Sequence, residues 1–119
     1  MRGNYDRKKH KADITDLLKL KEEFMNTIKW LEDWFGSLCD GDWEHIYGIK
    51  INTLDNPGWS VKIDIAETWY QDKVPVSVDI DNGDDDWIKC YFKDNQFIGV
   101  GDASKLEMII SVFRKWIET

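Results

Sequence analysis

Two short acidic segments, each beside a tryptophan, contain the residues of this chain whose types and spacing could do chemistry. They are Asp40, Asp42, Trp43 and Glu44 in the first segment, and Asp81, Asp84, Asp85, Asp86 and Trp87 in the second. Carboxylates in such groups can transfer protons, hold a metal ion or receive the lysines and arginines of a partner protein. A neighbouring tryptophan can add apolar contact area to an interface. Which use applies depends on the elements that position these side chains.

The second acidic segment invites comparison with a calcium-binding loop. The run Asp79–Asp86 departs from the EF-hand pattern because Gly83 falls one place early, no glutamate closes the loop, and strands are expected on both sides. A solvated hairpin turn is the better interpretation, and we expect no metal and no cofactor. The carboxylates beside Trp87 remain suited to receive basic side chains from a partner.

A catalytic site built on the first acidic segment would have to use His45. This residue follows Glu44 on an expected strand, where adjacent side chains point to opposite faces, so the two cannot form a direct acid–base pair. A Cys39–His45 nucleophilic pair lacks an identifiable orienting residue and an oxyanion loop. The chain also has no phosphate-binding glycine loop and no G-x-S-x-G motif. We therefore expect a core or interface histidine and no enzymatic activity.

Length and composition indicate one domain without a membrane span. The chain has 119 residues, of which 42% are hydrophobic and 33% are charged, and this suits a single globular domain. No apolar stretch approaches the roughly 20 residues that cross a bilayer, and the basic N-terminus lacks the apolar run of a secretory signal. We expect a cytoplasmic protein in which Cys39 and Cys90 are buried, reduced thiols.

Charge is unevenly distributed along the chain. Residues 1–24 contain seven Lys or Arg and five Asp or Glu, so residues 25–119 retain nine basic and 18 acidic groups, a net charge of −9. Such a surface repels nucleic acid and anionic membranes, and it attracts basic partners over long distances. We expect a basic protein partner and no binding to nucleic acid or membrane.

The change in charge near residue 25 coincides with a methionine. The segment Lys21–Phe24 can be encoded by a purine-rich sequence that resembles a ribosome-binding site directly before Met25. We hypothesise that Met25 is the natural start and that residues 1–24 are a non-native N-terminal extension. The alternative is a genuine N-terminal helical arm. The first hypothesis makes residues 25–119 the single domain.

Periodicity predicts two helices with a run of strands between them. Apolar residues recur at helical spacing over residues 13–38, in a helix that could instead begin at Asn26 or Thr27, and again after Asp102 or Ser104. Alternation of apolar and polar residues predicts strands at 43–54, 59–65, 74–81, 87–93 and 96–100. The expected fold class is α+β, a sheet of four or five mainly antiparallel strands with the N- and C-terminal helices packed on one face.

The expected core consists of apolar rows on three strands, covered by the two helices. The rows are Ile49/Ile51, Val61/Ile63/Ile65 and Val76/Val78/Ile80, and the covering side chains are Leu31, Phe35, Ile109 and Phe113. For the first two rows to share a face, the loop between them must contain an odd number of residues. We therefore expect an irregular turn or bulge around Gly58, with Trp59 packed in the core.

Several segments of the chain resemble a known family. They are Trp30–Phe35, Cys39–Ile51 with the sequence CDGDWEHIYGIKI, Leu54–Asp64 with the sequence LDNPGWSVKID, Asp86–Ile88 and the closing Leu106–Trp116. Together they are similar to the immunity protein 53 family of bacterial polymorphic toxin systems, over about residues 25–119. The resemblance implies a cytosolic antidote that binds the effector domain of a secreted toxin. Such toxins are often nucleases with basic surfaces, which the acidic domain would complement.

Charge and resemblance together predict a binding protein whose partner-binding residues are the two acidic segments with their tryptophans. One alternative is an acidic adaptor or nucleic-acid mimic without a toxin partner. The other is a small enzyme, which requires Asp40, Asp42, Glu44 and His45 to converge in a cleft with shifted pKa values. A toxin gene directly upstream would distinguish the immunity hypothesis from both.

Overall fold

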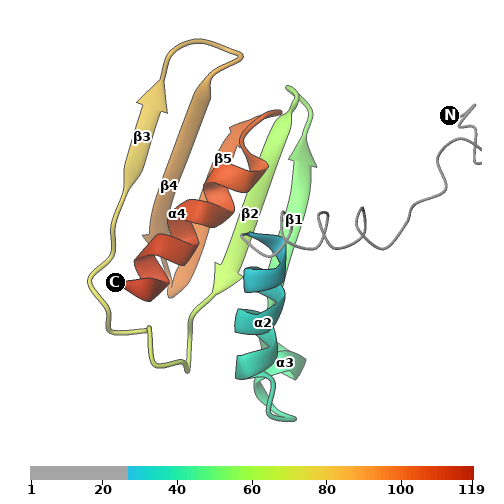
Figure 1. Cartoon of the computed structure of the whole chain (residues 1–119), viewed down its shortest axis with the longest axis vertical. Coiled ribbons are helices and arrows are strands. Elements are labelled where there is room, and N and C mark those ends of the chain that lie inside the picture. The colour runs from blue at the N-terminus through green and yellow to red at the C-terminus, as the bar shows by residue number, and fades with distance from the viewer. Residues whose placement is uncertain (1–26) are drawn as a thin grey trace, which may run out of the picture.

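The computed structural model describes residues 27–119, which form one antiparallel sheet with helices on one side (Figure 1). The helices are α2 (Ile28–Leu38), the short α3 (Trp43–Ile46) and α4 (Leu106–Glu118). The strands are β1 (Ile49–Leu54), β2 (Gly58–Asp64), β3 (Val78–Asp81), β4 (Trp87–Lys93) and β5 (Gln96–Asp102). Their order in the sheet is β1-β2-β5-β4-β3, and all neighbours are antiparallel. The predicted α+β fold class is confirmed. The hypothesis about Met25 and the expected helix before Thr27 lie outside the described residues.

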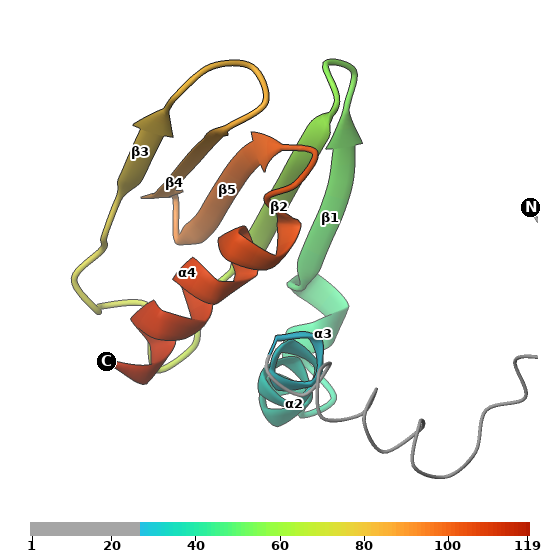
Figure 2. The same ribbon diagram turned by 45° about the horizontal axis from the view of Figure 1, so that its top comes forward.

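Both long helices contribute to one core on the inner face of the sheet. α4 lies across the middle strands, and α2 lies beside it near the start of β1 (Figure 1, Figure 2). Val61 of β2, Phe97 of β5 and Phe113 of α4 are completely buried. Trp34 of α2 packs edge-on against Phe113, with ring centroids 4.9 Å apart. The sheet and both helices therefore exclude water from a single shared cluster of apolar side chains.

The predicted apolar rows are buried in the centre of the sheet but not at its edges. The β2 row is buried as predicted, whereas Ile51 of β1 and Ile80 of β3 are 41% and 48% exposed. Both face the core side, because Ile51 pairs with Val61 and Ile80 pairs with Ile88. They remain exposed because α4 packs mainly on β2, β4 and β5. Val76 precedes β3 and is also exposed. The expectation of burial was therefore wrong for Ile51, Val76 and Ile80, whereas Ile49 and Val78 are partly buried against the core.

The predicted strand over residues 43–54 is wrong in its first half, where the chain forms α3. Asp40 accepts hydrogen bonds from the backbone N–H groups of Asp42 and Trp43. Glu44 reaches back to accept hydrogen bonds from the N–H groups of Asp40 and Gly41. Short acidic side chains that bond to nearby backbone N–H groups favour turns and helix starts over strands. The strand begins only at Ile49, after this turn.

The β1–β2 hairpin has the predicted odd number of loop residues but no bulge. Ile49 pairs with Ile63 and Leu54 pairs with Gly58, which leaves a three-residue loop, 55–57. The register continues through Gly58 without an extra residue. A side chain at Gly58 would collide with the backbone carbonyl of Gly101 on β5. Glycine is required there for close approach of two strands, and not for a bulge.

Candidate functional site

A cleft of about 660 Å³ opens at one end of the sheet, between the β1–β2 loop and the β3–β4 loop. The residues that line it include Asn56 and Pro57 from the first loop and Asp81, Asp84, Asp85 and Trp87 from the second hairpin. Four of the five residues in the second predicted acidic segment therefore border the same cleft. The link between β5 and α4 closes its base through Ala103 and Ser104.

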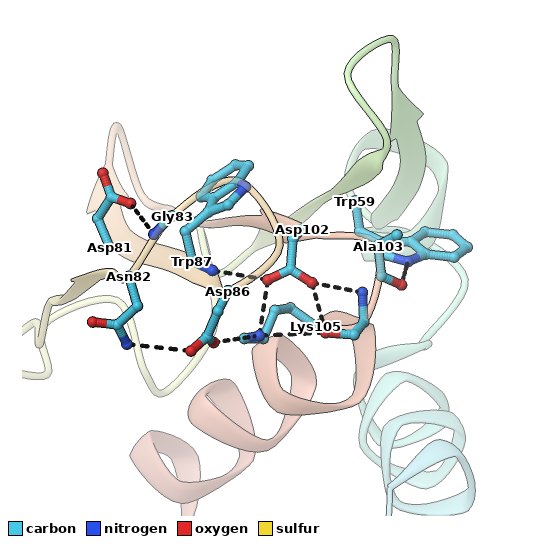
Figure 3. A network of polar contacts seen from close by, with 10 residues as sticks. Trp59, Asp81, Asn82, Gly83, Asp86, Trp87, Asp102, Ala103 and Lys105 are labelled. Atoms are coloured by element: carbon cyan, nitrogen blue, oxygen red, sulfur yellow. Dashed lines mark hydrogen bonds and ion pairs between the residues drawn. The ribbon is translucent and has the colours of Figure 1, made fainter.

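Lys105 connects the β3–β4 loop, which forms one wall of this cleft, to the start of α4 (Figure 3). Its Nζ lies 2.8 Å from Oδ2 of Asp102 and 2.9 Å from Oδ1 of Asp86. Asp102 is 3% exposed, and it also accepts hydrogen bonds from the N–H of Trp87 and from the N–H and hydroxyl of Ser104. The β3–β4 loop, the end of β5 and the first turn of α4 are thereby joined through one buried carboxylate.

The ion pairs of this network keep its members charged. The Lys105 ammonium, with Ser104 next in importance, holds the pKa of Asp102 well below its usual range. Lys105 and then Asn82 also lower the pKa of Asp86. Hydrogen bonds to Asp102 and Asp86 in turn raise the pKa of Lys105. Two carboxylates share one ammonium group, so the network itself retains a negative charge.

The carboxylates of Asp81, Asp84 and Asp85 have no basic partner among residues 27–119. All three are exposed, and Asp81 accepts a hydrogen bond from the N–H of Gly83, whose φ of 116° favours glycine. In this part of the chain, no group of three His, Cys, Asp or Glu side chains is arranged to hold a metal ion. The geometry suits basic side chains that enter the cleft from outside.

The first acidic segment forms a capped turn instead of lining a cleft. Hydrogen bonds from backbone N–H groups lower the pKa of Asp40 and that of Glu44. Trp43 is 6% exposed, and its indole N–H donates to the carbonyl of Ala66. Asp42 is exposed. In this segment the tryptophan is part of the interior, and the carboxylates give the turn its shape and its negative charge.

The two acidic segments lie at opposite ends of the sheet (Figure 1, Figure 2). α3 directly precedes the start of β1, whereas the cleft lies past its last residue, Leu54, which pairs with Gly58. A strand of seven residues, the length of β2, spans about 23 Å. The predicted site residues therefore form two separate acidic patches.

Residues 28–118 match the sequence model of immunity protein 53, which covers every described element from α2 to α4. The chain belongs to the immunity protein 53 family. Neither the curated proteins nor the solved structures gave a match. Among the described residues of this family member, no helix is long and apolar enough to cross a membrane.

The side chains of the catalytic alternative do not line the cleft of this immunity protein 53 domain. Asp40, Asp42, Glu44 and His45 are all absent from the lining of the cleft, which lies at the other end of the sheet. Asp40 and Glu44 already accept hydrogen bonds from the backbone. Their lowered pKa values suit structural carboxylates and oppose a role as proton donors at neutral pH.

The two cysteines differ in exposure. Cys90 of β4 is buried as predicted, whereas Cys39 is exposed, which corrects the expectation of a buried thiol. Cys39 lies just past the end of α2, and its thiol donates to the carbonyl of Phe35. Partial desolvation and the charges of Glu44 and Asp40 raise the pKa of Cys39. A raised pKa makes the reactive thiolate scarce, which disfavours nucleophilic catalysis.

The outer face of the sheet, which no described element covers, contains basic side chains. Lys62, Lys89 and Lys93 alternate with inward-facing residues of β2 and β4, and Lys50 of β1 pairs with Lys62. These four lysines are nearly half of the nine basic residues in positions 25–119. A positively charged molecule would therefore be attracted to the acidic ends of the domain more than to this face.

Sequence reasoning missed one exposed tryptophan. Trp69, in the β2–β3 connection, is 97% exposed. The available signal was its position among polar residues, Glu67, Thr68, Gln71 and Asp72, outside any alternating segment. In a loop of that composition, a tryptophan has no neighbouring apolar row to join.

Proposed function

We propose that this chain is a cytoplasmic immunity protein that neutralises a cognate toxin domain by binding it stoichiometrically, without metal or cofactor. Membership of the immunity protein 53 family supports a toxin as the partner. The net charge of −9 over residues 25–119 supports a basic toxin surface. A nuclease fits this description, because it needs a basic surface to hold nucleic acid.

The acidic cleft is the observation that carries the proposal for the binding surface. Asp81, Asp84 and Asp85 border a concave surface, and no basic residue among positions 27–119 forms an ion pair with them. Trp87 forms part of the wall and is half-buried. Lysines or arginines of the toxin would form ion pairs in the cleft. Asp86, which already pairs with Lys105, would add negative charge near the cleft without a direct contact to the toxin.

The acidic turn at the other end of the domain adds to the long-range field. Charged surfaces raise the association rate before contact, because they orient and attract an oppositely charged partner. Asp40 and Asp42 are exposed, and Asp40 and Glu44 also hold the backbone of this turn. Trp43 is buried and acts by packing.

The test is binding to the toxin domain encoded by the neighbouring gene, measured by stopped-flow kinetics at low and high salt. Asp84→Asn combined with Asp85→Asn should slow association several-fold at low salt and reduce its salt dependence. Glu32→Gln combined with Asp33→Asn removes the same charge from the surface of α2 and is the matched control. Failure of the wild-type chain to bind would overturn the function. Equal effects of the two double variants would remove the cleft from the contact surface.

A further inference from the structure

Trp69 presents almost its whole side chain to solvent, with an exposed fraction of 97%. Val74, in the same connection between β2 and β3, is 80% exposed. A tryptophan buries about 150–250 Å² when it enters an interior or an interface. Tryptophan is also enriched among the few residues that dominate binding energy in protein interfaces. The Trp69 ring is therefore the largest apolar group that the described domain offers to a partner.

The chain before Trp69 is held in place by three hydrogen bonds to neighbouring segments and to itself. Trp43 of α3 donates its indole N–H to the carbonyl of Ala66 at 3.0 Å. The hydroxyl of Thr68 donates to the carbonyl of Ile65 at 2.6 Å and accepts the N–H of Tyr70 at 3.1 Å. Trp69 thus follows a tightly bonded turn.

The chain after Trp69 is anchored in the core. Tyr70 packs against both Trp34 and Trp116, with ring centroids 6.1 and 6.4 Å apart. Trp116 donates its indole N–H to the carbonyl of Val74 at 2.8 Å. Two adjacent aromatic residues therefore have opposite environments, one against the core and one in solvent. Because the loop is ordered before binding, contact with Trp69 would cost little conformational entropy in this loop.

The backbone conformation of Glu67 is a second observation that favours a functional role for this loop. Its φ of 56° is in the left-handed region, which non-glycine residues seldom occupy. The conformation is supported by a hydrogen bond from its N–H to the Gln71 side chain, and by the Tyr47 hydroxyl, which donates to its carboxylate. Backbone strain that the surrounding structure maintains is characteristic of functional loops.

We propose that Trp69 is the main apolar anchor of the toxin interface and enters an apolar socket bordered by basic groups on the toxin. This inference rests on the proposed function and specifies where its binding energy is concentrated. It assigns the anchoring role to Trp69 in preference to Trp87, whose ring is half-buried, and to Trp43, which is buried.

Charge complementarity favours the toxin as the partner that contacts Trp69. Glu67 and Asp72 flank Trp69 and are exposed, and Asp42 is exposed on the adjoining α3 turn. The one basic residue of the loop, Lys73, places its Nζ 5.8 Å from the centre of the Trp116 ring. A second copy of this acidic chain would bring like charges together around the ring, whereas a basic toxin would pair with them.

The cleft and the Trp69 loop, at opposite ends of the domain, then affect different steps of binding. The uncompensated carboxylates of the cleft accelerate encounter and form solvent-exposed ion pairs with the toxin, and Trp69 slows dissociation through desolvated contact. Association rates respond mainly to charge, and dissociation rates respond mainly to buried contacts. Substitutions at the two ends should therefore be separable by kinetics.

The experiment combines binding kinetics with fluorine NMR of the full chain labelled with 5-fluorotryptophan. The probe is again the toxin domain encoded by the neighbouring gene. Trp69→Phe assigns the Trp69 resonance among the seven tryptophans. On addition of the toxin domain, the Trp69 signal should shift more than the signals of the buried Trp34 and Trp43.

Trp69→Ala should raise the dissociation rate constant about 30-fold or more, as expected for a dominant interface residue, and leave the association rate within about three-fold. Met108→Ala is the matched control, because Met108 is an exposed apolar residue of α4. Wild-type binding with an unchanged Trp69 signal and an unaffected Trp69→Ala variant would overturn this inference and leave the proposed function intact. Absence of wild-type binding would overturn both. Self-association that Trp69→Ala abolishes would identify a second copy as the occupant and also overturn it.

Discussion

The indole N–H of Trp43 donates a hydrogen bond to the backbone carbonyl of Ala66, with the two atoms 3.0 Å apart. This bond joins α3 to the β2–β3 connection, and the same segments meet again where the Tyr47 hydroxyl donates to Glu67. The Trp43 ring also lies 5.9 Å from that of Tyr47. A buried residue of the first acidic segment therefore helps to position the loop that displays Trp69.

Trp43→Phe should destabilise the protein, because it keeps an aromatic ring but removes the indole N–H and part of the packed volume. We expect a loss of about 1–3 kcal/mol in the free energy of unfolding, measured by urea denaturation. Trp69→Phe is the matched control and should change that free energy by less than about 0.5 kcal/mol, since its ring is exposed. Equal stabilities of the two variants would contradict the role of Trp43.

Gly99 of β5 lies directly beneath α4, where no side chain fits. A Cβ at this position would collide with Cγ2 of Ile109 and lie 3.2 Å from the Phe97 ring. Gly99→Ala should therefore lower the free energy of unfolding by about 1–3 kcal/mol. Gly36→Ala, on α2 with no atom within 4 Å of the added Cβ, should raise it by about 0.5–1 kcal/mol. Urea midpoints that move in the same direction would contradict this packing.

The central strands were predictable because the alternation of apolar and polar residues along each of them is local and clear. β2 and β4 each have one row of side chains in the core, so the alternation of residue types is clear. α3 was missed although its signal is also local, because the alternation of Trp43, His45 and Tyr47 outweighed the turn-forming acidic residues before them. The edge rows were overestimated because sequence does not reveal how far α4 extends across the sheet.

The candidate site was less predictable, because it depends on strand order and on contacts between distant residues. The sequence predicted that the second acidic segment would be a hairpin loop. It did not place Asn56 and Pro57 across a cleft from Asp84, since that arrangement follows from the order β1-β2-β5-β4-β3. The pairing of Asp86 with Lys105 and the opposite exposures of Trp43 and Trp69 are also tertiary outcomes.

Asp102→Asn should destabilise the protein in a pH-dependent manner. The folded state holds the pKa of Asp102 below its ordinary value of 3.8, so its contribution to stability is complete above that pH and is lost as pH falls through the lower folded-state value. The variant should therefore melt at a lower temperature than wild type at neutral pH, and the difference should narrow as the pH falls below about 4. Asp84→Asn is the control and should melt close to wild type throughout, because this exposed carboxylate forms no ion pair with the described part of the chain. A difference for Asp102→Asn that stays constant with pH would contradict the charged network.

The two cysteines should react with a thiol reagent at very different rates in the folded protein. Cys90 is 1% exposed, and its burial raises the pKa to about 11, so it is both inaccessible and protonated at neutral pH. Cys39 is accessible, but partial desolvation and the charges of Glu44 and Asp40 raise its pKa, so its reaction should be slower than that of a free thiol and should accelerate as pH rises. Ellman's reagent should therefore modify one thiol per native chain and two in denaturant. Cys39→Ser should remove the native reaction, and persistent labelling of that variant in native buffer would show that β4 opens or that Cys90 is not buried.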